Sequence, residues 1–321
     1  MTGVFREAEQ IVPAGTAIVV HAERAWADHI LRGENLFFEK LGKLAASRGL
    51  VPLLTRAEEI LSPLMLEAGG LHVMMGPKRH QGENIFHAHP SYLRGFWYLD
   101  TKGYFWNSSI RDKQFSANSV DAEAADKFLA EVFGHLNRNN LSKRPQPARL
   151  TSGVKPGAAL VVIQDIEKYS EQIHYLKSRA MIRNVSRATD RTVYVKLHPL
   201  LSETKRRDLT NFCNEIERVE VIEASVHELI GAVDVVVTQN SAVGVEAIMH
   251  QKPVLTCAKT DYHRGSIVCR SGAELRENFA YAREFADTFP FAKYFYWLMH
   301  EQMLRPNQED FALRAAARLF A

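Results

Sequence analysis

The feature that most constrains the fold of this chain is an alternation between short apolar runs and segments with helical periodicity. In the first half, strand-like runs at 16–23, 51–55 and 71–76 are separated by helical patterns at 35–49 and 57–66. A helix between two strands carries the chain back across the sheet, so strands joined in this way run parallel. The first half therefore predicts a parallel sheet with helices on its faces.

The same alternation restarts after a polar, proline-broken stretch at 137–147, which we interpret as a linker. The second series has strand-like runs at 159–164, 192–199, 219–223, 234–238 and 253–257, with helical patterns near 169–186, 202–217, 226–231 and 243–250. From about residue 274 the chain is helical and rich in aromatic residues. Its 321 residues are enough for two hydrophobic cores.

We therefore predict an α/β protein with two Rossmann-like, doubly wound domains facing each other across a cleft. The expected boundaries are an N-terminal domain at 1–145, a C-terminal domain at 146–273, and a helical tail at 274–321 that crosses back to the first domain. Residues 84–112 lack a clean period and contain many aromatic residues, so we expect a long functional loop or an irregular sheet edge there.

Composition excludes several classes of protein. The net charge is +3 and acidic and basic residues are interleaved, which does not favour a nucleic-acid partner. The three cysteines are far apart and lack metal-ligand spacing, as is typical of a reducing cytoplasm. No apolar run approaches the roughly 18 residues that a membrane-spanning helix needs. We expect a cytoplasmic protein.

The stretch DVVVTQNSAVGVEAIMHQKPVLT at 234–256 places small polar residues where an apolar strand meets a helix. Ligands of open α/β sheets bind beyond the carboxyl ends of the strands, where a helix N-terminus attracts phosphate. The candidate donor-binding residues here are Gln239, Asn240, Ser241, Gly244 and Glu246. Ser241 would bond a phosphate oxygen and Glu246 would accept bonds from ribose hydroxyls. The alternative is an ordinary serine N-cap.

Two further polar seams, meaning places where polar residues lie at or just after the end of a strand-like run, are found in the same half of the chain. Lys196 and His198 alternate along the strand-like segment YVKLHP, so both side chains face one side near its carboxyl end, where they suit a phosphate. Gln164, Asp165 and Glu167 follow the strand-like run at 159–164, and a carboxylate there suits a base or nucleophile at an anomeric centre. The alternatives are a structural histidine and a solvated helix start.

Together, the Gln-acid stretch at 164–167, Lys-x-His-Pro at 196–199, and the serine turn leading into Val-Gly-x-Glu-Ala and Lys-Pro-Val resemble bacterial capsule-polysaccharide glycosyltransferases. The Kdo transferases of capsule assembly are the most similar, and polysialyltransferases share the His-Pro and Ser motifs. The resemblance covers roughly residues 159–263. It departs from the family in lacking a second hydroxyl residue beside Ser241 and an adjacent Asp-Asp or Asp-Ser pair in the acidic stretch.

This resemblance implies a GT-B fold and a CMP-activated acidic sugar as donor. It also implies that His198 and the Asn240–Ser241 turn contact the CMP phosphate and that the acidic stretch serves chemistry. The first domain would then supply the acceptor side, for which the candidate residues are His21, Glu34, Asn35, His87 and His89. His-x-His could ligate a metal, but no third ligand of suitable spacing is evident, so we expect no metal.

The predicted function is a metal-independent glycosyltransferase with no cofactor other than its CMP-sugar donor. It would transfer Kdo or a sialic-acid-like sugar to a surface-polysaccharide or glycolipid acceptor, and a lipid-linked acceptor would bring it to the inner face of the cytoplasmic membrane as a peripheral protein. The predicted catalytic residues are Asp165, Glu167 and His198, and the predicted donor-binding residues are Gln164, Lys196, His198, Gln239, Asn240, Ser241, Gly244 and Glu246. The alternatives are a nucleotide-sugar 2-epimerase and a non-catalytic subunit of polysaccharide assembly with the same fold.

Overall fold

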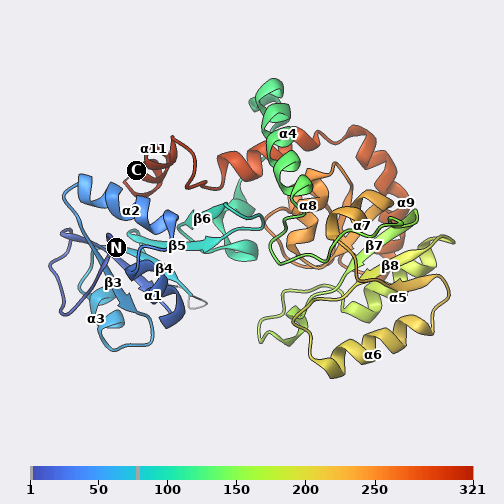
Figure 1. Ribbon diagram of the computed structural model, residues 1–321, viewed down its shortest axis with the longest axis horizontal. Coiled ribbons are helices and arrows are strands. Elements are labelled where there is room, and N and C mark those ends of the chain that lie inside the picture. Colours follow the sequence, from blue (N-terminus) through green and yellow to red (C-terminus); the bar gives the residue numbers. More distant parts are fainter. Residues whose placement is uncertain (1–2, 77–79, 321) are drawn as a thin grey trace. The chain divides into compact units, whose positions relative to one another are not determined.

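The computed structural model describes residues 3–76 and 80–320. The chain forms two compact units, each with its own six-stranded sheet (Figure 1). Unit 1 comprises Met1–Ser91, Gly95–Asp112 and Met299–Ala321, and unit 2 comprises Tyr92–Arg94 and Lys113–Leu298. Two doubly wound α/β sheets confirm the predicted fold class, whereas the predicted domain boundaries stay predictions.

The sheet of unit 1 has the strand order β1-β3-β2-β4-β5-β6 and is parallel except for β6, which pairs antiparallel with β5. Its strands are β1 (Arg6–Glu7), β2 (Ala17–Ala22), β3 (Val51–Arg56), β4 (Leu71–Met75), β5 (Ile85–Pro90) and β6 (Trp97–Asp100). Its helices are α1 (Arg24–Leu31), α2 (Leu36–Ser47), α3 (Leu61–Glu67) and α11 (Phe311–Leu319), with 3₁₀ turns η1 (Phe105–Asn107) and η2 (Ser109–Asp112). The antiparallel strand and the turns make residues 84–112 an irregular sheet edge. Helix α1 was not predicted from the sequence.

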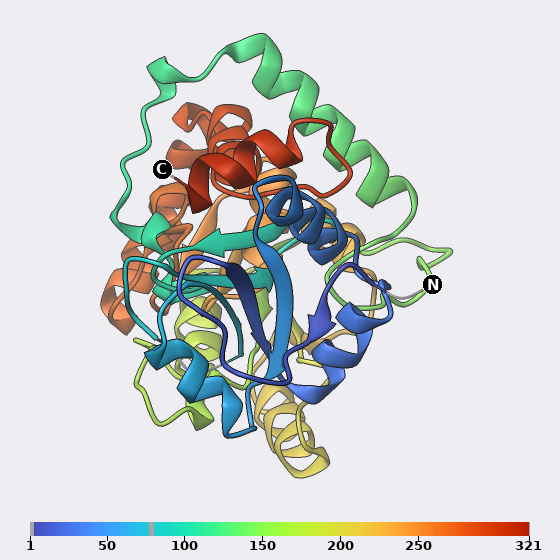
Figure 2. The same cartoon turned by 90° about the vertical axis from the view of Figure 1, so that its left-hand side faces the viewer.

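Successive residues of β2 point to opposite faces of the sheet, and each face has its own core. Ile18 and Val20 belong to the core on the side of α2 and α11, while Val19 belongs to the core on the side of α3. Helices α2 and α11 lie side by side, blue and red in Figure 2, and the rings of Phe37 and Phe311 meet edge to face at 5.5 Å. Helix α11, near the C-terminal end of the sequence, is therefore part of the same core as β2 and α2, which lie near the N-terminal end.

The sheet of unit 2 is wholly parallel, in the order β12-β11-β10-β7-β8-β9. Its strands are β7 (Gly157–Val162), β8 (Val193–Lys196), β9 (Val219–Val221), β10 (Val233–Thr238), β11 (Val254–Thr256) and β12 (Ile267–Val268). Its helices are α4 (Ala122–Arg138), α5 (Ser178–Ala188), α6 (Glu203–Asn214), α7 (Val226–Ala232), α8 (Ala242–Met249), α9 (Gly272–Thr288) and α10 (Phe291–Phe295). A π-helical segment, η6 (Tyr296–Glu301), continues α10, and short 3₁₀ turns are η3 (Ala117–Ser119), η4 (Ile166–Lys168) and η5 (His263–Gly265).

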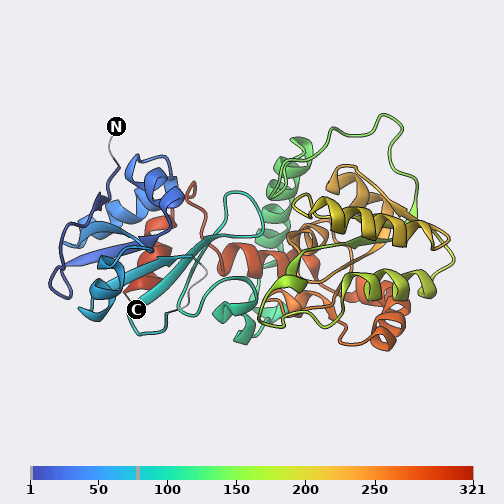
Figure 3. The same cartoon turned by 90° about the horizontal axis from the view of Figure 1, so that it is seen from below.

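The central strands of unit 2 are buried and rich in β-branched residues, as expected for a parallel sheet covered on both faces. Every residue of β7 is buried. On one face, α9 packs against α5 (Figure 3). A side chain at Gly272, the first residue of α9, would collide with Asn184 of α5, because an added Cβ would lie 2.7 Å from its Nδ2. The two helices therefore approach closely at the start of α9.

The helix expected near 169–186 begins only at Ser178. The preceding residues follow the end of β11 instead, because the amides of Tyr175 and Leu176 both donate to the carbonyl of Cys257. The carboxylate of Glu167 accepts a hydrogen bond from the amide of Ser178 at 2.7 Å, which satisfies a free N–H of the first turn of α5. The helix therefore starts where its N-terminus gains a partner.

Aromatic residues of the predicted helical tail pack inside unit 2. Phe295 lies 5.7 Å from Phe128 of α4, and Tyr294 meets Phe115 edge to face at 5.1 Å, measured between ring centroids. These rings are therefore part of the packing of unit 2. Across residues 3–76 and 80–320, no helix is both long and apolar enough to cross a bilayer.

Candidate functional site

The sheet of unit 2 has one point at which its strand order reverses. Strand β7 lies beside β10, while the connections run outward to β8 and β9 on one side and to β11 and β12 on the other. In open α/β sheets, ligands bind at the carboxyl end of such a switch point. Gln164 follows β7 and Asn240 follows β10, and the amide of Asn240 donates to Gln164 Oε1 at 2.9 Å. Two of the three predicted seams therefore meet there.

The side chains of the 239–241 turn are bonded to the protein. Gln239 Nε2 donates to the carbonyl of Leu176 at 2.9 Å, and Asn240 Nδ2 donates to the carbonyl of Lys259 at 3.0 Å. Ser241 Oγ accepts from the amide of Val243 at 3.2 Å, so it is the N-cap of α8. These bonds hold the turn in shape and present the positive end of α8 at the switch point.

Gly244 leaves space for a neighbouring ring. A Cβ at this position would lie 2.5 Å from Tyr262 Oη and 2.9 Å from the ring itself. Tyr262 is fully buried and donates its hydroxyl hydrogen bond to the carbonyl of Ser241 at 2.9 Å. Glycine at 244 therefore allows Tyr262 to pack closely against the start of α8, and the bond from Tyr262 to Ser241 supports the turn.

Glu246 is the most unusual group of the site. Its side chain is fully buried in α8, and its contacts with Ser142 and the amide of Lys143 fall short of good hydrogen-bond geometry. Burial raises the pKa of Glu246 from 4.5 to about 7, although Ser142, Lys143 and Lys196 face it and oppose that rise. A buried carboxylate without well-formed hydrogen bonds is costly. It is therefore a candidate for bonding a ligand hydroxyl.

Two lysines face this carboxylate from different elements. Lys196 ends β8 and donates from Nζ to the carbonyl of Ala224 at 2.7 Å, and burial lowers its pKa. Burial, followed by the charge of Arg144, lowers the pKa of Lys143 to about 8. Partly buried cations at a helix N-terminus suit a phosphate. Lys143 was missed from the sequence because its basic pair lies in a stretch that looks like a linker.

The segment that carries Lys143 is fastened to α7. Ser225 Oγ donates to Asn140 Oδ1 at 2.5 Å, and the amide of Val226 donates to Gln146 Oε1 at 2.9 Å. His227 Nε2 lies 2.8 Å from the carbonyl of Leu141, so this nitrogen carries the proton and donates. The predicted linker is therefore an anchored part of the site.

His198 is half-buried near the end of β8. Its Nδ1 accepts a hydrogen bond from the amide of Leu200 at 3.2 Å, so a neutral ring carries its proton on Nε2. Burial, followed by the charge of Arg144, lowers the pKa of His198. A neutral imidazole in this tautomer is a hydrogen-bond donor from Nε2. It could thus donate to an anionic oxygen without being protonated.

The two predicted catalytic carboxylates have different surroundings. Asp165 forms ion pairs with Lys168 at 2.8 Å and Lys205 at 2.7 Å. Burial acts to raise the pKa of Asp165, but the hydrogen bonds from both lysines outweigh it and lower the pKa. Glu167 instead bonds the first turn of α5 at Ser178. Asp165 is thus kept ionised near the switch point, while Glu167 has a structural partner.

The candidate acceptor-side residues of unit 1 do not form one cluster. Glu34 is paired at the surface with Arg32, whose hydrogen bond lowers the Glu34 pKa to about 2, and Asn35 is the N-cap of α2. His87 is buried, with Nε2 3.0 Å from the carbonyl of His80. The remaining two, His89 and His21, lie on β5 and β2: the ring of His89 stacks on Tyr104 at 4.2 Å, and His21 lines a cavity together with residues of α3. In the part of the chain that the structure describes, no three His, Cys, Asp or Glu side chains gather as metal ligands.

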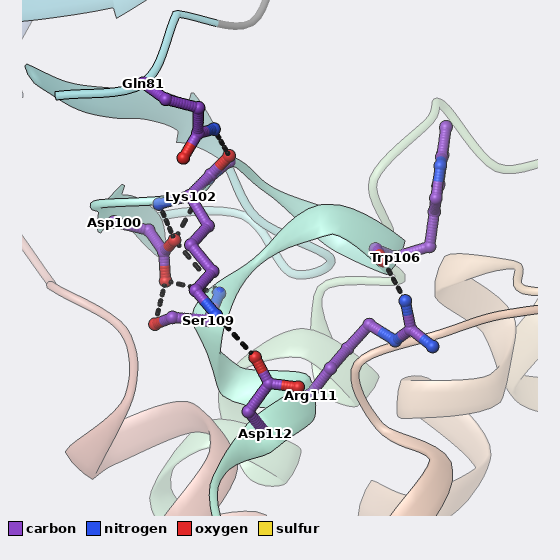
Figure 4. Close-up of polar contacts among 8 residues, drawn as sticks. Gln81, Asp100, Lys102, Trp106, Ser109, Arg111 and Asp112 are labelled. Carbon is purple, nitrogen blue, oxygen red and sulfur yellow. Dashed lines mark hydrogen bonds and ion pairs between the residues drawn. The ribbon is translucent and has the colours of Figure 1, made fainter.

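A buried aspartate shapes the aromatic loop after β6. Asp100 Oδ1 accepts from the amides of Lys102 at 2.8 Å and Gly103 at 3.0 Å, and Oδ2 accepts from Ser109 Oγ at 2.6 Å (Figure 4). The loop between these donors carries the aromatic residues at 104–106. One carboxylate therefore ties both ends of the loop together, which sequence inspection did not reveal.

Comparison with known proteins gives one family and several similar structures. A family model described as "Capsule polysaccharide biosynthesis protein" matches residues 134–300, just over half of the chain. The structure of Thermosulfurimonas dismutans KpsC, beta Kdo 2,7 transferase, is similar with 15% identity and a TM-score of 0.50, over 83% of this chain and 89% of that chain. No match was found among curated proteins.

Two other structures are more distant. The second KpsC structure from Thermosulfurimonas dismutans, beta Kdo 2,4 transferase, has 14% identity and a TM-score of 0.45, over 83% of this chain and 90% of that chain. A glycosyltransferase from Rickettsia africae has 8% identity and a TM-score of 0.42, over 95% of this chain and 99% of that chain. At these identities the KpsC likeness at a TM-score of 0.50 establishes the fold, which is of GT-B type.

Proposed function

This chain belongs to the family of capsule polysaccharide biosynthesis proteins, and from that premise we propose that it is a glycosyltransferase using a CMP-activated acidic sugar. The transferred sugar would be Kdo or a sialic-acid-like sugar, and the acceptor a surface polysaccharide or glycolipid. The sequence motifs support this donor class, as does the GT-B fold shared with a protein described as a Kdo transferase.

The observation that carries the proposal is the buried carboxylate of Glu246 at the switch point of unit 2. None of its contacts with the protein has good hydrogen-bond geometry, and Lys143 and Lys196 face it beside the N-terminus of α8. A ribose offers the hydroxyl donors that Glu246 lacks. A nucleotide phosphate offers the negative charge that the two lysines and the helix end favour. A nucleotide would therefore supply both the hydroxyl groups that bond Glu246 and the negative charge that the two lysines and the helix N-terminus favour.

The reaction breaks the bond between the anomeric carbon of the sugar and the phosphate oxygen, and CMP departs with the electron pair. The acceptor hydroxyl oxygen becomes bonded to the sugar and loses its proton. Lys143 and Lys196 would offset the charge that develops on the departing phosphate, and Nε2 of His198 would donate to it. These groups offset the charge without requiring a metal.

Of the two predicted carboxylates, Asp165 fits a chemical role better than Glu167. Its ion pairs keep it ionised, and it follows β7 at the switch point. We assign it the role of base or nucleophile at the anomeric centre. Glu167 is assigned the structural role of holding the start of α5. Peripheral contact with the inner membrane surface stays an expectation.

The proposal is tested first by calorimetric binding of CMP, UDP, GDP and ADP, and then by CMP release from CMP-Kdo and CMP-sialic acid. We expect CMP to bind most tightly and one CMP-sugar to be turned over. Lys143→Met should weaken CMP binding at least tenfold, while the exposed Lys155→Met is the matched control and should leave it unchanged. Preference for another nucleotide, or equal affinity in both variants, would overturn the assignment.

A further inference from the structure

One basic residue beside the switch point of unit 2 is exposed and lies on anchored backbone. Arg144 is exposed, and the chain is fastened to α7 on both sides of it. The carbonyl of Leu141 accepts a hydrogen bond from His227 at 2.8 Å, and Gln146 Oε1 accepts one from the amide of Val226 at 2.9 Å. Gln146 Nε2 also donates to the carbonyl of Arg144 at 3.1 Å. The backbone that carries this guanidinium is therefore held beside the site.

Basic side chains of the described chain lie close enough to His198 for their charges to act on its ring. They are Arg144, Lys168 and Arg206. Lys168 is paired with Asp165 at 2.8 Å. Arg206 donates to the carbonyl of His198 at 3.2 Å and pairs with a surface glutamate at 3.1 Å. The guanidinium of Arg144 forms no hydrogen bond or ion pair with any residue in 3–76 or 80–320, so its N–H donors are available to a ligand.

The chemistry of the proposed donor places a second anion beside the phosphate. In CMP-Kdo and CMP-sialic acid, the anomeric carbon carries a carboxylate group as well as the phosphate oxygen. The groups assigned to the phosphate are Lys143, Lys196 and His198. Asp165 is assigned to the anomeric carbon, and its charge would repel a carboxylate there unless a cation faced that carboxylate. A planar guanidinium with available donors matches a carboxylate through two parallel hydrogen bonds.

We propose that Arg144 binds the carboxylate of the transferred sugar and thereby selects acidic sugars over neutral ones. The inference rests on the proposed function, because it assigns the sugar part of the donor to a residue beside the proposed nucleotide site. Lys143, which is partly buried, and Arg144, which is exposed, would then bind the two anionic groups of the donor. A nucleotide sugar without a carboxylate would leave Arg144 without a partner.

The experiment uses the full chain and measures binding by calorimetry in the absence of an acceptor. The probes are CMP, CDP, CMP-Kdo and CMP-sialic acid. CMP offers the phosphate without the carboxylate, and CDP offers a second phosphate in place of the sugar. Arg144→Met removes the cation, whereas Arg144→Lys keeps the charge but not the planar pair of donors. Arg187→Met is the matched control, because Arg187 is an exposed arginine in the last turn of α5.

Arg144→Met should weaken binding of at least one of the two CMP-sugars about tenfold or more, as expected for the loss of a charge-assisted hydrogen bond. It should weaken binding of CMP by no more than about threefold, because solvent and salt screen an exposed charge. Arg144→Lys should give an intermediate affinity for that CMP-sugar. Arg187→Met should match the wild type with every probe, and thermal unfolding of each variant verifies that it is folded.

This design separates the two proposals. Equal losses of affinity for CMP and the CMP-sugars would place the guanidinium on the phosphate, and unchanged affinity for the CMP-sugars would show that it contacts no part of the donor. Either result overturns the role of Arg144 while the proposed nucleotide site stands. Binding of CDP that is tighter than binding of CMP only when Arg144 is present would assign this residue to a second phosphate, against the inference. If none of the probes binds to the wild type, the proposed donor site itself is overturned, and the inference with it.

Discussion

The pKa of Glu246 leads to a prediction in which stability and ligand binding change in opposite directions. Glu246→Gln removes a buried carboxylate that lacks well-formed hydrogen bonds. Folding raises its pKa from 4.5 to about 7, so the folded state binds more protons than the unfolded state between these values, and the wild type loses stability as the pH rises through this window. The glutamine variant carries no such titration.

The size of the effect follows from the two pKa values. At about 1.4 kcal/mol per pH unit, the difference between 4.5 and about 7 corresponds to about 3 kcal/mol when Glu246 is fully ionised. The variant should therefore be more stable than the wild type by about 3 kcal/mol at pH 8 and by only about 1 kcal/mol at pH 5. The attraction of Lys143 and Lys196 is already contained in this value, because both lysines act to lower the pKa of Glu246.

Urea unfolding at pH 5 and pH 8, followed by circular dichroism, measures both values. Glu277→Gln on the exposed side of α9 is the matched control and should change stability by no more than about 0.5 kcal/mol at either pH. Calorimetry at pH 8 should show that Glu246→Gln binds CMP at least tenfold more weakly. A variant that is less stable than the wild type at pH 8, or whose gain does not grow with pH, would refute the unpaired carboxylate. Unchanged CMP affinity would refute its role toward ribose.

Three other experiments address the remaining parts of the molecule. Asp165→Asn should lower sugar transfer at least a hundredfold. Glu167→Gln should mainly lower the stability of the protein, by about 1 kcal/mol, because it weakens the hydrogen bonds at the start of α5. Equal losses of activity in the two variants would contradict this division of roles. Gly244→Ala should destabilise unit 2 by about 2 kcal/mol because its Cβ meets Tyr262, and Tyr262→Leu should reduce that cost in the double variant, as measured by denaturant unfolding. Asp100→Ala should increase amide hydrogen exchange throughout the loop that follows β6, and protection equal to the wild type would show that the loop is held by other contacts.

The arrangement of strands and helices could be predicted because its signals are local. A run rich in β-branched residues, such as β10, indicates a strand within only six residues. Strands that are separated by helices run parallel. The polar seams at Gln164, Lys196 and Ser241 could be found for the same reason, since each follows a recognisable strand. The resemblance to capsule-polysaccharide glycosyltransferases used these seams, and the family match agrees with it.

The start of α5 shows where local signals were insufficient. The apolar and polar spacing at 169–186 is compatible with a helix throughout, yet the amides of Tyr175 and Leu176 bond to Cys257, far away in the sequence. Helical propensity is a weak preference that a tertiary contact readily overrides. No property of the segment itself specifies that partner.

What the sequence determined by itself is the fold class and the edge of the second sheet at which the polar residues gather, because strand direction and side-chain alternation are properties of short segments. Only the tertiary structure decided which polar groups meet there. Lys143 faces Glu246 because the carbonyl of Leu141 is bonded to His227, 86 residues further along the chain. The raised pKa of Glu246 likewise depends on burial by distant segments. Burial and long-range hydrogen bonds are created only when the chain packs, so spacing along the sequence does not encode them directly.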